Sequence, residues 1–115
     1  MKYHLYYDKE CETCKEFIRI FNEYNIDVIL KDIEEKVGWQ PGAYRWEQID
    51  LTEEFGHPSS FIPMVLMVDG EIKKLLVGGT TKQENENLNK NINIFTSHDD
   101  GIQKLIKIVE HEKVN

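Results

Sequence analysis

Two cysteines three positions apart, Cys11 and Cys14, constrain this chain more than any other feature of its sequence. They are the only cysteines among its 115 residues. The segment 2–7 before them is aromatic and β-favouring, and the apolar residues after them recur with helical spacing. A C-x-x-C between a strand and a helix places one thiol at the helix N-terminus, where backbone N–H groups and the helix dipole stabilise a thiolate. This arrangement is typical of a thiol–disulfide exchange centre.

The length and charge of the chain limit the number of domains and the kinds of partner that we expect. With 115 residues and 40% hydrophobic content, we expect a single domain over residues 1–115. The formal net charge is −7 and there is no basic run, so the sequence gives no support for nucleic-acid or membrane binding. Because no apolar stretch has the length of a signal-peptide core or a membrane span, we expect a cytoplasmic protein. In a reducing compartment a C-x-x-C pair is more often redox-active or metal-binding than a structural disulfide.

Hydrophobic periodicity predicts a β-α-β unit, a second helix, a β-hairpin turning at Asp69-Gly70 and a C-terminal helix. The polar, Asn-rich segment at about 80–100 indicates an insertion, either a mobile loop or an extra element. Within it, residues 92–95 alternate over too short a length to define a strand. Asp99 or Asp100 is the expected cap of the last helix. The predicted elements are strand 2–7, helix 11–24, strand 26–33, helix 44–55, strand 64–68, strand 72–77 and helix 101–113.

This order of elements, with Ile62-Pro63 before a strand and Gly78-Gly79 after the hairpin, resembles the glutaredoxin family, in particular compact and bacteriophage-type dithiol glutaredoxins. The resemblance implies an α/β fold that is thioredoxin-like and of glutaredoxin type, with a central four-stranded mixed sheet flanked by helices. It also implies that Pro63 is cis and faces the sulfur atoms, with Ile62 offering its backbone to a bound thiol peptide. The glycine pair would let a ligand carboxylate approach the backbone.

The predicted function is that of a small thiol–disulfide oxidoreductase. Cys11 is the expected nucleophile and Cys14 the thiol that resolves the mixed disulfide. We expect no bound cofactor and no metal. The resemblance implies glutathione as a co-substrate and disulfide-containing proteins as partners, with ribonucleotide reductase as one candidate. The residues expected to bind substrate or glutathione are Lys9, Thr13, Ile62, Pro63, Gly78 and Gly79.

Three alternatives stay open. A thioredoxin reductase can replace glutathione as electron donor, which is favoured by the net charge of −7 and by incomplete glutathione-binding residues. The cysteines can instead hold zinc or an iron–sulfur cluster in a non-enzymatic module, although no histidine has ligand spacing to them. Finally, the protein can be a redox-controlled regulator that binds a partner protein through the loop between Trp39 and Trp46. Lys15 and Arg45 are further candidates for pairing with a ligand carboxylate, and His57 is a candidate acid or base.

Overall fold

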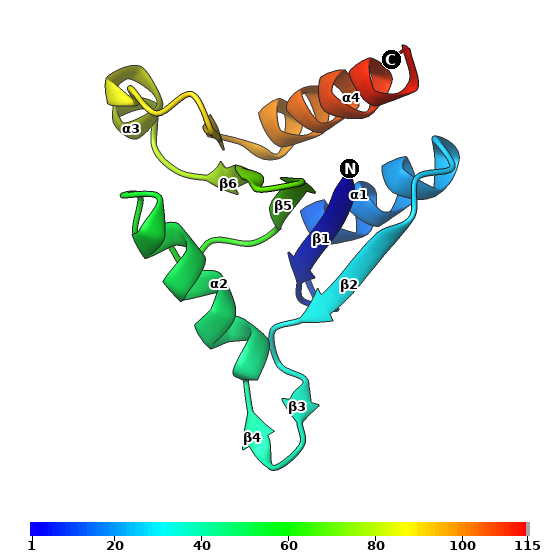
Figure 1. Ribbon diagram of the computed structural model, residues 1–115, viewed down its shortest axis with the longest axis vertical. Helices are drawn as coiled ribbons and strands as arrows, with labels where there is room; N and C mark the ends of the chain where they lie inside the picture. The colour runs from blue at the N-terminus through cyan, green and yellow to red at the C-terminus, as the bar shows by residue number, and fades with distance from the viewer. Residues whose placement is uncertain (115) are drawn as a thin grey trace.

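The computed structural model describes residues 1–114 and arranges them as a five-stranded sheet with helices on both faces (Figure 1). Residue 115, with which the predicted domain ends, lies outside the described residues. A separate two-stranded hairpin projects from one end of the sheet. The elements are β1 (Lys2–Tyr7), α1 (Glu12–Glu23), β2 (Val28–Asp32), β3 (Lys36–Val37), β4 (Gln40–Pro41), α2 (Ala43–Glu54), β5 (Met64–Asp69), β6 (Ile72–Gly78), α3 (Thr81–Glu86), β7 (Ile92–Phe95) and α4 (His98–Val114).

The strand order is β2-β1-β5-β6-β7. β1 and β2 run parallel, with Leu5 opposite Leu30, because α1 crosses between them. β5 is antiparallel to β1, and β6 returns antiparallel to β5 through the predicted turn at Gly70. A parallel β-α-β unit joined to an antiparallel hairpin, with the helices on both faces, is the thioredoxin-like α/β fold that the sequence predicted.

The predicted sheet of four strands is wrong by one strand. β7 pairs in parallel with β6, so the polar insertion contributes a fifth strand as well as the short helix α3. Ile92 and Ile94 are buried on the α2 face of the sheet, and Phe95 is buried on the other face. Four residues with three apolar positions are therefore enough to form a strand here, because the edge of β6 supplies the hydrogen-bonding partner.

The start of the last helix also differs from the expectation. α4 begins at His98, and the hydroxyl of Ser97 accepts a hydrogen bond from the Asp100 N–H at 3.1 Å. Ser97 is therefore the cap in place of Asp99 or Asp100. The Asp100 carboxylate instead accepts the Thr96 N–H at 2.9 Å. Among the described helices, none combines the length and apolarity that a bilayer crossing requires.

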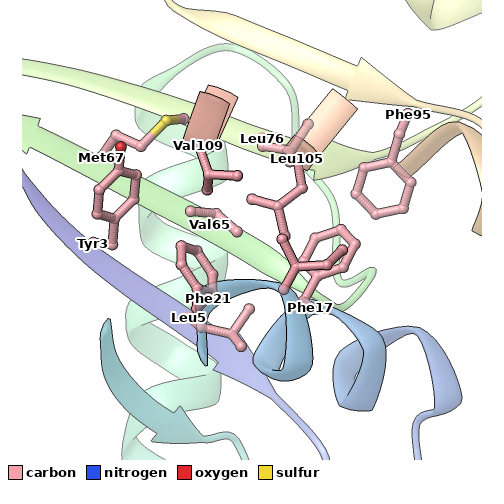
Figure 2. Close-up of a cluster of buried hydrophobic side chains, with 11 residues drawn as sticks. Tyr3, Leu5, Phe17, Phe21, Val65, Met67, Leu76, Phe95, Leu105 and Val109 are labelled. Carbon is pink, nitrogen blue, oxygen red and sulfur yellow. The ribbon is translucent and has the colours of Figure 1, made fainter. Parts of the chain in front are cut away.

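The core is divided between the two faces of the sheet. Alternate side chains of β1 point to opposite faces, so Tyr3 and Leu5 pack under α1 and α4 while Tyr6 packs under α2. Figure 2 shows the larger cluster, in which side chains of α1 and α4 meet those of the sheet. Its fully or nearly fully buried members are Tyr3, Leu5, Phe17, Ile20, Phe21, Val65, Met67, Leu76, Phe95, Leu105 and Val109.

Lys104 of α4 ties the insertion to the rest of the protein. Its ammonium group donates to the Ile94 carbonyl at 2.6 Å and to Asp100 at 3.0 Å, and it also pairs with Glu84 of α3. The free-energy cost of burying the Lys104 ammonium group is offset, because two carboxylates and a carbonyl accept hydrogen bonds from its N–H groups. The helix α3 is closed at its N-terminus by a capping box between Thr80 and Gln83. The insertion is therefore an ordered part of the fold.

Two leucines test this description of the core. Leu105 is fully buried between α4 and the sheet, whereas Leu88 in the insertion is 94% exposed. We expect Leu105→Ala to lower the free energy of unfolding by about 2–5 kcal/mol, because it removes buried methyl groups and leaves a cavity. The matched change Leu88→Ala should stay within about 0.5 kcal/mol of the parent. Denaturant unfolding followed by circular dichroism measures both, and equal effects would contradict the assigned packing of α4.

Candidate active site

The two cysteines lie in the first turn of α1. Cys11 is the N-cap residue, with an extended backbone (φ −91°, ψ 116°), and its Sγ accepts a hydrogen bond from the Cys14 N–H at 3.1 Å. A sulfur atom therefore occupies the position that a serine or aspartate oxygen takes in an ordinary helix cap. Cys11 is partly exposed and Cys14 is completely buried, and both are free thiols. The pair thus combines one accessible sulfur with one covered sulfur a turn further on.

The electrostatics of Cys14 differ from those of an ordinary thiol. Burial raises its pKa far above the usual range, and a hydrogen bond with the Cys11 side chain raises it further. A backbone hydrogen bond with Asp8 acts in the opposite direction but is the smaller effect. Cys14 therefore stays protonated near neutral pH. The role expected of it, attack on a disulfide already formed by Cys11, requires that its proton leave during that step.

The loop before β5 contains a cis peptide bond next to the β5–β6 hairpin. The Ile62–Pro63 peptide bond is cis, as predicted, and Pro63 is buried. The N–H and C=O of Ile62 have no hydrogen-bond partner among the residues that the structure describes. The loop itself is held by Gln48 of α2, which is 1% exposed and donates through Nε2 to the carbonyls of Ser59 at 3.1 Å and Phe61 at 3.3 Å. No sequence pattern pointed to Gln48.

The glycine pair faces atoms of the protein itself. A Cβ built on Gly79 would lie 2.7 Å from Gln83 Oε1 and 2.8 Å from Ile94 Cγ2. The N–H of Gly79 donates to the Phe95 carbonyl at 3.0 Å, and the Gly78 carbonyl lies 3.2 Å from Nε2 of buried His57. The close approach that requires glycine is thus made by α3, β7 and His57.

The cations proposed to meet a ligand carboxylate are each paired with a carboxylate of the chain. The distances are 3.7 Å for Lys9–Asp32, 3.2 Å for Lys15–Glu12 and 2.5 Å for Arg45–Glu34. A hollow of about 360 Å³ lies beside the N-terminus of α1, lined by Tyr7, Asp8, Lys9, Glu10, Asp32, Glu34 and Glu35. Its charged residues are acidic except for Lys9. An incoming ligand therefore meets a negative surface on this side of Cys11.

Thr13, predicted as a binding residue, contacts a histidine from the far end of the chain. Its Oγ1 lies 2.7 Å from Nδ1 of His98, 85 positions later. His98 also lines a hollow of about 330 Å³ together with Phe61, Ile62, Gly78, Gly79 and residues 95–97. His98 is one of the histidines that were set aside as zinc ligands because none has ligand spacing to the cysteines. No local pattern signalled this contact, because the predicted last helix began at residue 101, whereas α4 begins at His98.

Other predicted features fall outside this site. Trp39 and Trp46 are 86% and 63% exposed, in the β3–β4 hairpin turn and the first turn of α2, respectively. His57 is buried beneath the glycine pair, and its N–H closes the end of α2 by donating to the Thr52 carbonyl at 2.9 Å. In the described part of the chain, no three side chains of His, Cys, Asp or Glu gather as metal ligands would.

The strand order, the cis proline before β5 and the dithiol at the start of α1 define the class of protein: a thioredoxin-fold protein with a Cys-x-x-Cys site. No family model and no curated protein matches the chain. Among solved structures it is similar to thioredoxin 1 from the thermophilic eubacterium Thermosipho africanus TCF52B, with 17% identity. That alignment covers 98% of this chain and 99% of the other, with a TM-score of 0.39.

The different environments of the two thiols predict selective labelling. In the native, reduced protein near neutral pH, iodoacetamide should modify Cys11 and leave Cys14 unmodified, because burial raises the pKa of Cys14 and covers its sulfur. In denaturant both should react. Peptide mapping by mass spectrometry identifies the labelled residue, and Cys11→Ser is the control that should take up no label in the native state. Comparable labelling of both cysteines in the native protein would contradict the assigned geometry.

Proposed function

We propose that the protein is a dithiol thiol–disulfide oxidoreductase that reduces disulfides in other proteins. The observation that carries the proposal is the pairing of a partly exposed Cys11 at the helix cap with a buried Cys14 one turn later. An exchange centre needs an accessible nucleophile and a nearby second thiol, and helix N-terminal N–H groups stabilise the thiolate form of the nucleophile.

The reaction proceeds in two exchanges. The Cys11 thiolate attacks one sulfur of the substrate disulfide, so that a Cys11–substrate disulfide forms and the other substrate sulfur leaves as a thiolate that takes up a proton. Cys14 then loses its proton and attacks the Cys11 sulfur, which releases the second substrate thiol. The protein ends with a Cys11–Cys14 disulfide. The substrate has gained two electrons and two protons, and a separate donor must return them to the protein.

The cis-proline loop supports a polypeptide as the substrate. The free N–H and C=O of Ile62 can pair with the backbone of an extended segment, as the edge of a sheet pairs with an added strand. The hollow that Ile62 and His98 help to line offers space for a neighbouring side chain of the substrate. Disulfide-containing proteins, with ribonucleotide reductase among the candidates, are the proposed partners, and a reducing cytoplasm is the proposed setting.

Two electron donors are candidates. Glutathione is the donor that the glutaredoxin resemblance implies, through Lys9, Thr13 and the glycine pair. Two observations favour a thioredoxin reductase instead. The Gly79 N–H is occupied by Phe95, and the nearby cations are occupied by carboxylates of the chain. The net charge of −7 further opposes the approach of an anionic tripeptide.

Substitution of each cysteine tests the two exchanges separately. Cys11→Ser should reduce the rate of protein-disulfide reduction by about three orders of magnitude or more, because the nucleophile is lost. Cys14→Ser should retain the first exchange and accumulate a mixed disulfide with the substrate, visible on non-reducing gels and by mass spectrometry. Full turnover by Cys11→Ser would contradict the assignment of Cys11 as the nucleophile.

The donor is tested with the oxidised protein. We expect NADPH with thioredoxin reductase to reduce it at least about tenfold faster than glutathione, since electrostatic steering alone changes association rates by that order. Lys9→Glu should slow reduction by glutathione and leave reduction by the reductase less affected. If glutathione at cellular concentration is the faster reductant, the glutaredoxin interpretation is correct and the reductase proposal is wrong.

A further inference from the structure

His98 lies at the site, but no sequence pattern pointed to it and the proposed exchange reaction gives it no role. It is the first residue of α4 and is exposed, and its Nδ1 lies 2.7 Å from Oγ1 of Thr13. Thr13 stands between the two cysteines in the first turn of α1. The N-termini of two helices therefore meet at this hydrogen bond, and both present positive dipole ends to the region of the sulfur atoms.

The bond restrains the turn that carries the sulfur atoms. That turn is closed by the Cys14 N–H donating to Cys11 Sγ at 3.1 Å, with Thr13 lying inside the closed loop. A side chain that fixes Thr13 thus limits motion of the turn as a whole. His98 also lines the hollow beside Ile62, so its imidazole borders both the dithiol turn and the loop proposed to hold substrate.

The contact persists whether or not the imidazole is charged. Neutral Nδ1 can accept the threonine O–H, and protonated Nδ1–H can donate to the same oxygen. Histidine is also the side chain that ordinarily changes charge between about pH 5 and pH 8. A protonated His98 would therefore add a positive charge beside the dithiol turn without breaking the link to Thr13.

Most of the titratable groups around His98 are already paired with other residues, so they do not cancel the positive charge of a protonated imidazole. On α1 the facing titratable group is Glu16, which interacts electrostatically with His98 but is held by Arg19 at 2.5 Å. On α4 the neighbours are Asp99 and Asp100, and Asp100 is paired with Lys104. The residues that share the hollow with His98 carry no titratable side chain; they are Phe61, Ile62, Gly78, Gly79, Phe95, Thr96 and Ser97.

We propose that His98 is a positioning residue, held beside the dithiol turn by its hydrogen bond with Thr13, and that protonation of its imidazole increases the reactivity of Cys11. The inference rests on the proposed function, since it concerns the same thiol. Near the dithiol, Lys9 and Lys15 are each paired with a carboxylate, Asp32 and Glu12 respectively. A cation at His98 would stabilise the Cys11 thiolate by direct electrostatic attraction.

The test is the rate of Cys11 alkylation by iodoacetamide in the reduced, full-length protein from about pH 5 to about pH 9. In the parent we expect the rate profile to show, besides the titration of the thiol, a second inflection from the imidazole. In His98→Gln, which keeps a hydrogen-bonding group and loses the charge, the inflection should disappear. At about pH 6 the alkylation rate should fall about three- to tenfold, as expected for the loss of one partly screened charge.

A second variant tests whether the Thr13 hydroxyl holds the imidazole beside the dithiol turn. Thr13→Val keeps the branched shape and removes the hydroxyl, and it should also abolish or strongly reduce the inflection. The matched control is His111→Gln, near the other end of α4, which should keep the parent profile. Thermal unfolding of all variants confirms that they are folded. A parent-like profile in His98→Gln, or in Thr13→Val, would overturn the proposal.

This outcome is separable from the proposed function. Alkylation requires neither a disulfide substrate nor an electron donor, so it reports on Cys11 even if the protein reduces no protein disulfide. Conversely, loss of turnover in Cys11→Ser would support the oxidoreductase assignment whatever the pH profile of His98→Gln.

Discussion

The position of the reactive sulfur depends on the packing of α1 against the sheet and against α4. Phe17 and Phe21 are fully buried on one side of this helix, where they meet Leu5, Leu105 and other apolar side chains of the cluster (Figure 2). Because these contacts fix the rotation of α1 about its axis, they decide that Cys14 points inward. Cys11, at the cap, stays partly exposed. The chemistry of the dithiol is therefore set by core packing as much as by the cysteines themselves.

The insertion takes part in the same arrangement. The centroid of the Phe95 ring in β7 lies 5.8 Å from that of Phe17, and the absence of a side chain at Gly101 leaves room for the Phe95 ring. Directly after β7, the chain turns into α4 and brings His98 to Thr13. A segment that looks like a polar loop in the sequence thus joins the far edge of the sheet to the N-terminus of α1. Its Phe95 carbonyl also accepts the Gly79 N–H, which bears on the choice of electron donor.

The parts of the structure that follow from local patterns could be predicted from the sequence. The β-favouring segment 2–7, the helical spacing after Cys14 and the Asp69-Gly70 turn predicted these elements, their order along the chain and the position of the dithiol. The family resemblance correctly implied that the Ile62–Pro63 bond is cis. β7 could not be predicted, because four residues carry too little periodicity and its stability comes from pairing with β6.

Contacts between residues that are far apart in the sequence likewise could not be predicted from local sequence patterns. The link between Thr13 and His98 spans 85 positions, and no pattern in either segment signals it. Gly78 and Gly79 matched a family position, but a side chain at Gly78 would meet Phe61 and Phe95, and one at Gly79 would meet Gln83, Ile94 and His57. These contacts depend on distant parts of the chain. The charges were visible in the sequence, whereas the pairing of Lys9 with Asp32 was not.

The central claim is that Cys11 and Cys14 form a reversible redox couple, and an equilibrium redox titration tests it most directly. The protein is equilibrated in dithiothreitol buffers of graded potential, quenched, and analysed by intact mass. The account predicts a single transition with the slope of a two-electron couple, in which the chain loses two hydrogen atoms and gains a disulfide mapped to these cysteines. A chain that forms no intramolecular disulfide at any potential, or that releases a bound metal on oxidation, would contradict it.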